Sequence, residues 1–429
     1  MTPQSTFMVV APILPEREGA LRLLLNGMNR LPGTADPENA LLPFGRFDRL
    51  HYARFVILRD GTLGDLAAVG IAFPDAPVYL AFLGDCDGPA ESLLDAFAAE
   101  AGPGLRRIFD HCEGFDETID LGGWLRAANV TPAVRYVNWV GRTAVQIRHD
   151  AALHAVLRAY LVQHAAVLAG EPPRAISDRL RAHSRAAGPA PYREQPTPPG
   201  WRVGEVLDAI GGALLLLLLA PPLLLVAPIF LVLLRWHERA DPAITPRPDP
   251  VHVADLSRIE DHDVGNQFSA FGTVKPGRFR RTTLIALLWL VNYTTRHIYT
   301  RGSLGRVGTI HFARWVFLDD KRRLFFASNY DGSLDSYMDD FINKVAFGLN
   351  LVFSNGIGYP RTRFLVLGGA KDEQAFKYYI RRHQLPTEVW YKAYPGLTAY
   401  DLARNASISA GLDRDDMTDR EIRQWLATI

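Results

Sequence analysis

Residues 310–332, IHFARWVFLDDKRRLFFASNYDG, contain two apolar runs separated by a short charged segment, and this pattern predicts a β-hairpin. A second hairpin is predicted earlier in the chain, because residues 50–58 read LHYARFVIL and residues 82–88 read FLGDCDG. The shared residues follow the same order, offset by 260 positions in the first strand and 244 in the second. Phe7 and Phe268 extend the match upstream, at an offset of 261. The sequence therefore predicts two copies of one domain.

Each copy is predicted to run strand, helix, strand, strand, helix, strand, which is the order of the split βαβ or ferredoxin-like unit. Its antiparallel sheet carries helices on one face only, so the other face must be covered. Two units that cover each other enclose a barrel-like cavity. The predicted fold class is therefore α+β. The predicted segments are a first repeat at 1–170, a Pro-rich linker at 171–204, a membrane-inserted segment at 205–238, a linker at 239–263, a second repeat at 264–412 and a C-terminal tail or helix at 413–429.

This strand and helix order, together with the duplication, resembles the dimeric α/β-barrel superfamily, which includes dye-decolourising peroxidases, chlorite dismutases and cofactor-free monooxygenases. Residues 84–88, GDCDG, are also similar to the GxxDG motif of dye-decolourising peroxidases, whose aspartate stands distal to haem. The corresponding residues 328–332, SNYDG, lack the first glycine. The resemblance implies a haem cofactor, with Asp87 or Asp331 in the distal position. No family motif identifies the proximal histidine, and His297 and His311 are the candidates in the second copy.

Each candidate has a structural alternative. Asp87 and Asp331 end strands directly before a glycine and a predicted helix, where an aspartate usually caps the helix N-terminus. The two histidines can equally be packed or surface residues. Arg54 and Arg314 project from equivalent strands among apolar residues, so each needs a protein carboxylate or an anionic ligand if it is buried. We expect Arg314 to line a ligand cavity and Arg54 to be paired within the protein.

The region between the copies differs from both. Residues 171–200 contain seven prolines, which is typical of a solvated linker. Residues 209–234 form a run of 26 residues without a charge, apolar on every side, which predicts membrane insertion. Pro221 and Pro222 interrupt this run at its midpoint, so it forms either a kinked spanning helix or a re-entrant hairpin. Basic residues flank both ends and both copies must meet, so we favour the hairpin, with both domains cytoplasmic.

Net charge and apolar segments narrow the classes of partner that this protein can bind. The net charge of +1 and the absence of an arginine-aromatic array argue against nucleic acid as a partner. Residues 284–291, LIALLWLV, can anchor in the membrane interface or pack on their own sheet. We expect a membrane protein that binds a lipid or another lipophilic small molecule. It is either a haem-dependent, peroxidase-like oxidoreductase, or a non-catalytic lipid-binding or scaffold module for a partner membrane enzyme.

Overall fold

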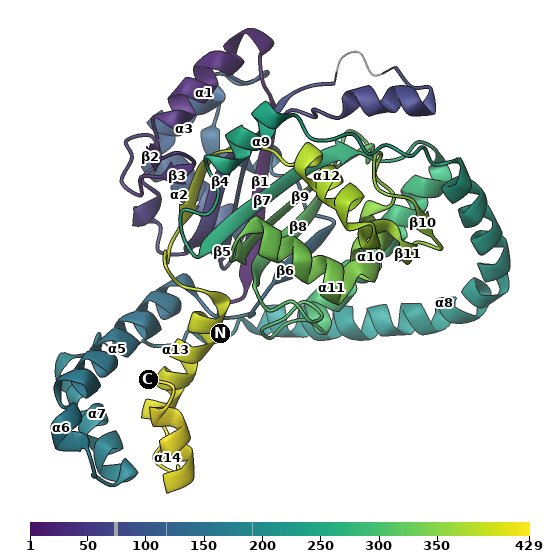
Figure 1. The fold of residues 1–429 in the computed structure, drawn as a ribbon. Coiled ribbons are helices and arrows are strands. Elements are labelled where there is room, and N and C mark those ends of the chain that lie inside the picture. Colours follow the sequence, from purple (N-terminus) through teal and green to yellow (C-terminus); the bar gives the residue numbers. More distant parts are fainter. Residues whose placement is uncertain (73–75, 117, 191) are drawn as a thin grey trace.

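Two β-sheets form the centre of the protein (Figure 1). The computed structural model describes residues 1–72, 76–116, 118–190 and 192–429, and its fold is α+β, as predicted. The first sheet is mixed and contains, in spatial order, β1 (Gln4–Pro12), β5 (Tyr79–Asp87), β4 (Leu50–Leu58), β12 (Thr387–Lys392), β3 (Thr34–Ala35) and β2 (Asn29–Leu31). The second is antiparallel and contains β6 (Val134–Val137), β8 (Ile310–Leu318), β9 (Arg323–Asp331) and β7 (Gly265–Thr273). A small separate hairpin joins β10 (Thr362–Arg363) to β11 (Leu367–Gly368).

We call residues 1–198 the first half of the chain and residues 241–429 the second half. The last strand of each half lies in the sheet of the other half. β6 pairs with β8, and β12 pairs with β4. As a result, the order β1-β5-β4-β12 in one sheet is matched by β7-β9-β8-β6 in the other. The register breaks at equivalent places, between Leu50 and Tyr52 and between Ile310 and Phe312. Each four-strand series is therefore completed by a strand from the other half of the chain.

A packed core, and not the predicted barrel-like cavity, lies between the two sheets. One buried apolar cluster contains side chains from the facing strands of both, among them Met8, Val56, Leu83, Val316 and Phe325. These residues alternate along their strands with residues of the outer-face cores, as expected for strands that are buried on both sides. The buried pair Arg54 and Arg314 lies in the same layer.

Helices cover the outer faces of the sheets. Four lie with the first sheet, namely α1 (Glu18–Asn26), α2 (Ala90–Glu100), α3 (Gly102–Phe109) and α4 (Leu121–Ala127). Three lie with the second, namely α10 (Arg278–His297), α11 (Leu334–Phe353) and α12 (Glu373–His383). The short helix α9 (Pro250–Ser257) leads into β7.

A helical bundle stands apart from the sheets (Figure 1). It contains α5 (Ala144–Gln163), α6 (Ala165–Leu168), α7 (Pro173–Ala187), α13 (Ala399–Leu412) and α14 (Asp419–Leu426). Leu157, Leu180, Ile408 and Trp425 meet in its core. The predicted linker at 171–204 is therefore wrong over α7. Ile176 and Leu180 are four residues apart, so this Arg-rich segment has an apolar stripe that the bundle buries.

The apolar run lies within one continuous helix, α8 (Pro199–Ala240), which has 42 residues. It is long and apolar enough to cross a membrane, with a mean hydropathy of 2.7 over its most apolar window and none of that window buried. Pro221, Pro222 and Pro228 lie inside the helix, so the favoured hairpin with a turn at the prolines is wrong. Figure 1 shows instead that α8 curves as a long bow along one side of the second half.

Candidate functional site

The predicted aspartates each pair with a histidine on the neighbouring strand. The Asp87 carboxylate accepts from His51 Nε2 at 2.9 Å, and Asp331 accepts from His311 Nε2 at 2.7 Å. All four side chains are almost fully buried. The pairs occupy equivalent positions in the two sheets, because His51 follows Leu50 in β4 as His311 follows Ile310 in β8.

The second oxygen of each aspartate caps a helix, but not the helix expected. Asp87 accepts from the backbone N–H of Ala144 at 2.9 Å, and Asp331 from that of Ala399 at 2.7 Å. These amides begin α5 and α13, far away in the sequence. The helix directly after Asp87 has no side-chain cap, and the helix after Asp331 is capped by Ser333. The aspartates therefore fasten the bundle helices to the sheets.

Tyr394 adds a third member to the first pair. Its hydroxyl lies 3.0 Å from His51 Nδ1, so in the neutral imidazole Nε2 donates to Asp87 and Nδ1 accepts from the tyrosine. Burial raises the pKa of Tyr394 well above its ordinary value, so the phenol keeps its proton at neutral pH. A cavity of about 20 Å³ touches both histidines and Tyr394, which is room for about one water molecule.

These histidines do not fit haem. A haem ligand needs a free imidazole nitrogen that faces a cavity of several hundred cubic ångströms. In both pairs Nε2 is occupied by an aspartate, and the cavity beside them has about 20 Å³. Within the described residues, no group of three or more His, Cys, Asp or Glu side chains is arranged to hold a metal ion.

Arg314 is paired within the protein, which is the reverse of the expected arrangement. Its guanidinium donates to the Asp85 carboxylate and to the backbone oxygens of Phe7, at 2.7 Å, and Gly84, at 3.0 Å. It is 3% exposed and lies in the packed layer between the sheets, so the prediction that it lines a ligand cavity is wrong. Burial lowers the pKa of Arg314, and Asp85 opposes this effect.

Arg54 bonds to no carboxylate within the part of the chain that the structure describes. It donates to the side chains of Gln267, Ser269 and Asn329 and to two backbone oxygens, all of them neutral. Burial lowers the pKa of Arg54, and the nearby Arg314 lowers it further. The interior is filled around this guanidinium, so the network is structural.

His297 belongs to the contact between α8 and α10. Its Nε2 lies 2.9 Å from Asp208, and Arg296 makes ion pairs with Glu205 and Asp208 at 2.5 and 2.9 Å. The Tyr293 hydroxyl donates to the Ala209 backbone oxygen at 2.8 Å. One face of α10 packs on the second sheet, as one of the two alternatives for residues 284–291 predicts, and another contacts α8.

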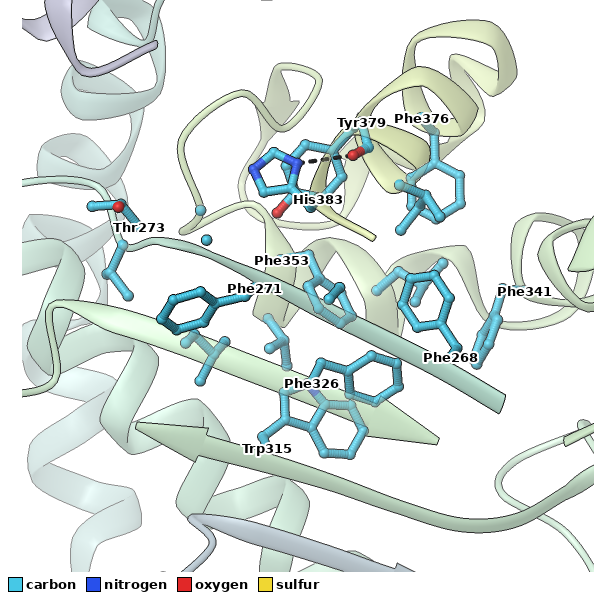
Figure 2. A pocket seen from close by; sticks show the side chains of 18 of the residues that line it. Phe268, Phe271, Thr273, Trp315, Phe326, Phe341, Phe353, Phe376, Tyr379 and His383 are labelled. Carbon is cyan, nitrogen blue, oxygen red and sulfur yellow. Dashed lines mark hydrogen bonds between the residues drawn. The ribbon is translucent and has the colours of Figure 1, made fainter. Parts of the chain in front are cut away.

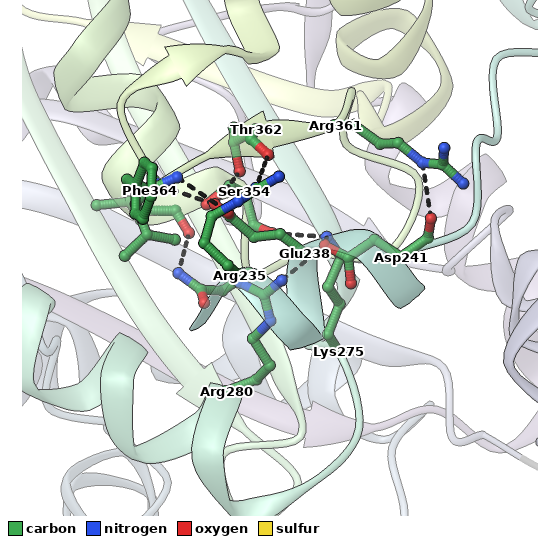
Figure 3. Close-up of polar contacts among 12 residues, drawn as sticks. Arg235, Glu238, Asp241, Lys275, Arg280, Ser354, Arg361, Thr362 and Phe364 are labelled. Carbon is green, nitrogen blue, oxygen red and sulfur yellow. Dashed lines mark hydrogen bonds and ion pairs between the residues drawn. The ribbon is translucent and has the colours of Figure 1, made fainter. Parts of the chain in front are cut away.

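The far end of α8 is fixed to the same half by a second polar cluster (Figure 3). The buried Glu238 carboxylate accepts from Arg235, from Thr362 Oγ1 and from the backbone N–H groups of Phe364 and Leu365. Asp241, the residue after the helix, pairs with Lys275 at 2.7 Å and with Arg280 at 2.6 Å. Burial lowers the pKa of Lys275 to about 8, against the opposing effect of Asp241.

An apolar cavity lies between the second sheet and the helices that cover it (Figure 2). It has about 50 Å³, and Phe268, Trp315, Phe326, Phe353 and Tyr379 are among its lining residues. A cavity of this size fits a few apolar atoms and no drug-sized ligand. His383 stands at its edge, with Nδ1 bonded to the Tyr379 backbone oxygen at 2.8 Å, and burial lowers its pKa.

Tyr394 and Asp85 are not among the residues that the sequence predicts for a site. Asp85 lies inside the GDCDG segment beside Asp87, whereas no local pattern marks Tyr394. Cys86 and Cys112 are free and buried. Comparison with known proteins adds no family: no family model, no curated protein and no solved structure matches this chain.

Proposed function

We propose that this protein is a monotopic membrane module that binds lipid, and that α8 inserts into one leaflet without crossing the bilayer. The exposure of α8 is the observation that carries the proposal. Leu224 and Leu225 are 74% and 81% exposed, and many other large apolar side chains of the helix are also in contact with solvent. An exposed apolar surface of this extent marks a membrane or protein interaction site.

The attachment of both helix ends to α10 supports insertion without crossing. Ala209 of α8 contacts Tyr293, and Phe230 contacts Phe279 with 5.4 Å between ring centroids. The α8 contacts are about 31 Å apart along the helix axis, whereas the α10 contacts are about 21 Å apart. The segment between them must bow away from the body, and Pro221 lies within it, where a proline allows a bend. The apolar apex can thus enter a leaflet while both ends stay at its surface.

The proposal extends to the fold and to the side of the membrane. The matched strand orders and register breaks support a duplication of one split βαβ unit that exchanged its last strand. Free thiols at Cys86 and Cys112 support a reducing compartment, so we place both halves on the cytoplasmic face. We favour the non-catalytic module over the oxidoreductase, because the histidine–aspartate pairs do not fit haem.

Flotation with neutral phosphatidylcholine vesicles tests this proposal. Replacing Leu224 and Leu225 by Asp places carboxylates on the inserting surface. Each change should weaken partitioning by up to about 3 kcal/mol, or roughly a hundredfold. Leu23→Asp is the matched control, because Leu23 of α1 is 77% exposed on the first half and should leave flotation unchanged. Equal flotation of all variants, or no flotation of the natural protein, would rule the proposal out.

A further inference from the structure

Two cavities lie beside the first turns of α8 and meet at one residue, Arg296. The first, called here the basic cavity, has about 290 Å³ and is lined by Arg135, Trp201, Glu205 and Arg301 among others. The second, called here the interhelical groove, has about 280 Å³ and runs between α8 and α10. Its walls include Leu207, Gly211, Leu215 and Trp289. Both cavities include Arg296 in their lining.

The basic cavity has more positive than negative charge. Its carboxylate Glu205 is bonded to Arg296, and the next acidic residue, Asp208, is bonded to Arg296 and His297. The guanidinium groups of Arg135 and Arg301 make no hydrogen bond or ion pair within residues 1–72, 76–116, 118–190 and 192–429.

Arg135 supports a site for an anion more strongly than Arg301 does, because Arg135 is partly buried and Arg301 is exposed. It lies on β6, whose backbone is bonded to α10 through Thr295. Burial and the nearby Arg296 lower the pKa of Arg135, and the charges of Glu205 and Asp208 only partly oppose this effect. A partly desolvated cation that bonds to no carboxylate lowers stability unless an anion joins it. The cavity is thus prepared for an anionic group.

The interhelical groove leads from that cavity toward the apolar part of α8. Close approach of the two helices depends on Gly212, because a Cβ there would overlap the Tyr293 ring. The neighbouring Gly211 has open space in front of it, so the groove continues along the helix. Trp201 lines the basic cavity and Trp289 lines the interhelical groove, and tryptophan is enriched at the depth of lipid headgroups.

We propose that the basic cavity binds the phosphate of an anionic phospholipid, and that the interhelical groove holds one of its acyl chains. This inference rests on the proposed membrane insertion of α8. Arginine is the side chain best suited to phosphate, because its planar guanidinium donates two parallel hydrogen bonds. Arg135 and Arg301 bind the phosphate oxygens, and Arg296 stands where headgroup and chain meet. The same phosphate chemistry also occurs in soluble metabolites, and the experiment separates the two sources.

The test uses the full chain in a nonionic detergent, titrated with dioctanoyl phosphatidylglycerol and followed by native mass spectrometry. Dioctanoyl phosphatidylcholine and glycerol phosphate are titrated in parallel. We expect the phosphatidylglycerol to bind most tightly. Arg135→Gln should weaken it at least about tenfold, because a charged hydrogen-bond donor to phosphate is lost. Arg107→Gln removes an equal charge from an exposed site on α3 and should change nothing.

Stability distinguishes a binding role of Arg135 from a structural role. Because the Arg135 guanidinium makes no hydrogen bond or ion pair within the described residues, Arg135→Gln should keep or raise the melting temperature, whereas loss of a structural arginine would lower it. If this variant does not fold, Arg301→Gln, at an exposed position, must give the same loss of phosphatidylglycerol binding.

Three results would overturn the inference. Equal binding of phosphatidylcholine would remove the role of the anionic headgroup, and equal binding of glycerol phosphate would make the cavity a site for soluble phosphates. Unchanged phosphatidylglycerol binding in the Arg135 and Arg301 variants would show that the lipid binds at another site. Flotation on neutral vesicles is measured for each variant, and the proposed function stands if flotation persists while the lipid preference fails.

Discussion

Arg54 and Arg314 are buried between the sheets, and of the two only Arg314 bonds to a carboxylate, that of Asp85. Asp85 follows Gly84 in β5, and Asn329 follows Ser328 in β9, at the offset of 244 that relates the two hairpins. Arg314 therefore has a carboxylate partner, whereas Arg54 is held by neutral oxygens. The strands repeat at this position, but the charge does not. Substitution of Asp85 should reveal this difference directly.

Asp85→Asn should destabilise the fold by about 3–5 kcal/mol, because it leaves the Arg314 guanidinium buried without a counter-charge. The double variant Asp85→Asn/Arg314→Met should recover part of that loss, since no unpaired charge remains. Urea unfolding followed by circular dichroism measures both. A double variant that loses as much as the sum of the two single variants would contradict the expected coupling.

The C-terminal end of α8 is held by a loop with unusual backbone geometry. Phe364 and Leu365 have φ values of 54° and 59°, which non-glycine residues rarely adopt. Their N–H groups point at one anion, the Glu238 carboxylate, in the manner of an anion-binding nest. The loop and the helix therefore stabilise each other. Hydrogen bonds from two backbone amides and Thr362 lower the pKa of Glu238, together with Arg235, although burial alone would raise it.

Glu238→Ala should release this end of α8. The amides of Phe364 and Leu365 lose their acceptor at a cost of about 1–3 kcal/mol each, so their hydrogen exchange should become roughly ten- to a hundredfold faster. Arg239→Ala is the matched control, because Arg239 is the exposed neighbour and should leave both amides protected. Exchange rates that rise equally in the two variants would contradict the role of Glu238.

The pairing of β6 with β8 and of β12 with β4 joins the two halves of the protein. β6 comes before α8 in the chain and pairs with β8, which comes after it. A single crossing by α8 would place β6 and β8 on opposite sides of the bilayer, where they cannot pair. The strand exchange is therefore the strongest argument that both halves lie on one side.

Tags placed before Gln4 and after Leu426 should both be cleaved by protease in inside-out vesicles, and both should be protected in intact spheroplasts. The reason is that the paired strands keep both halves on one side of the membrane, and the proposed function takes that side to be the cytoplasmic face. A tag inside the 242–249 loop, where Thr245 and Arg247 are exposed, should behave in the same way. Opposite protection of the N-terminal and C-terminal tags would show a single span and contradict both the topology and the proposed monotopic insertion.

Local residue patterns were sufficient to identify the longer strands, the helices that pack on the sheets at α1, α2, α10, α11 and α12, and the apolar run. The alternation around Arg314 and the uncharged residues 209–234 are properties of neighbours in the chain, and hydrophobic burial acts on them locally. Pro221 and Pro222 favoured a hairpin, but the structure has one bent helix through them. Contacts of both ends of this helix with α10 hold it in the bent shape. Strand partners and polar partners were decided only in three dimensions. The residues of β6 indicate a strand, but not which strand it pairs with. Asp87 accepts a hydrogen bond from the Ala144 amide 57 positions away, because the pairing of β6 with β8 brings Ala144 there.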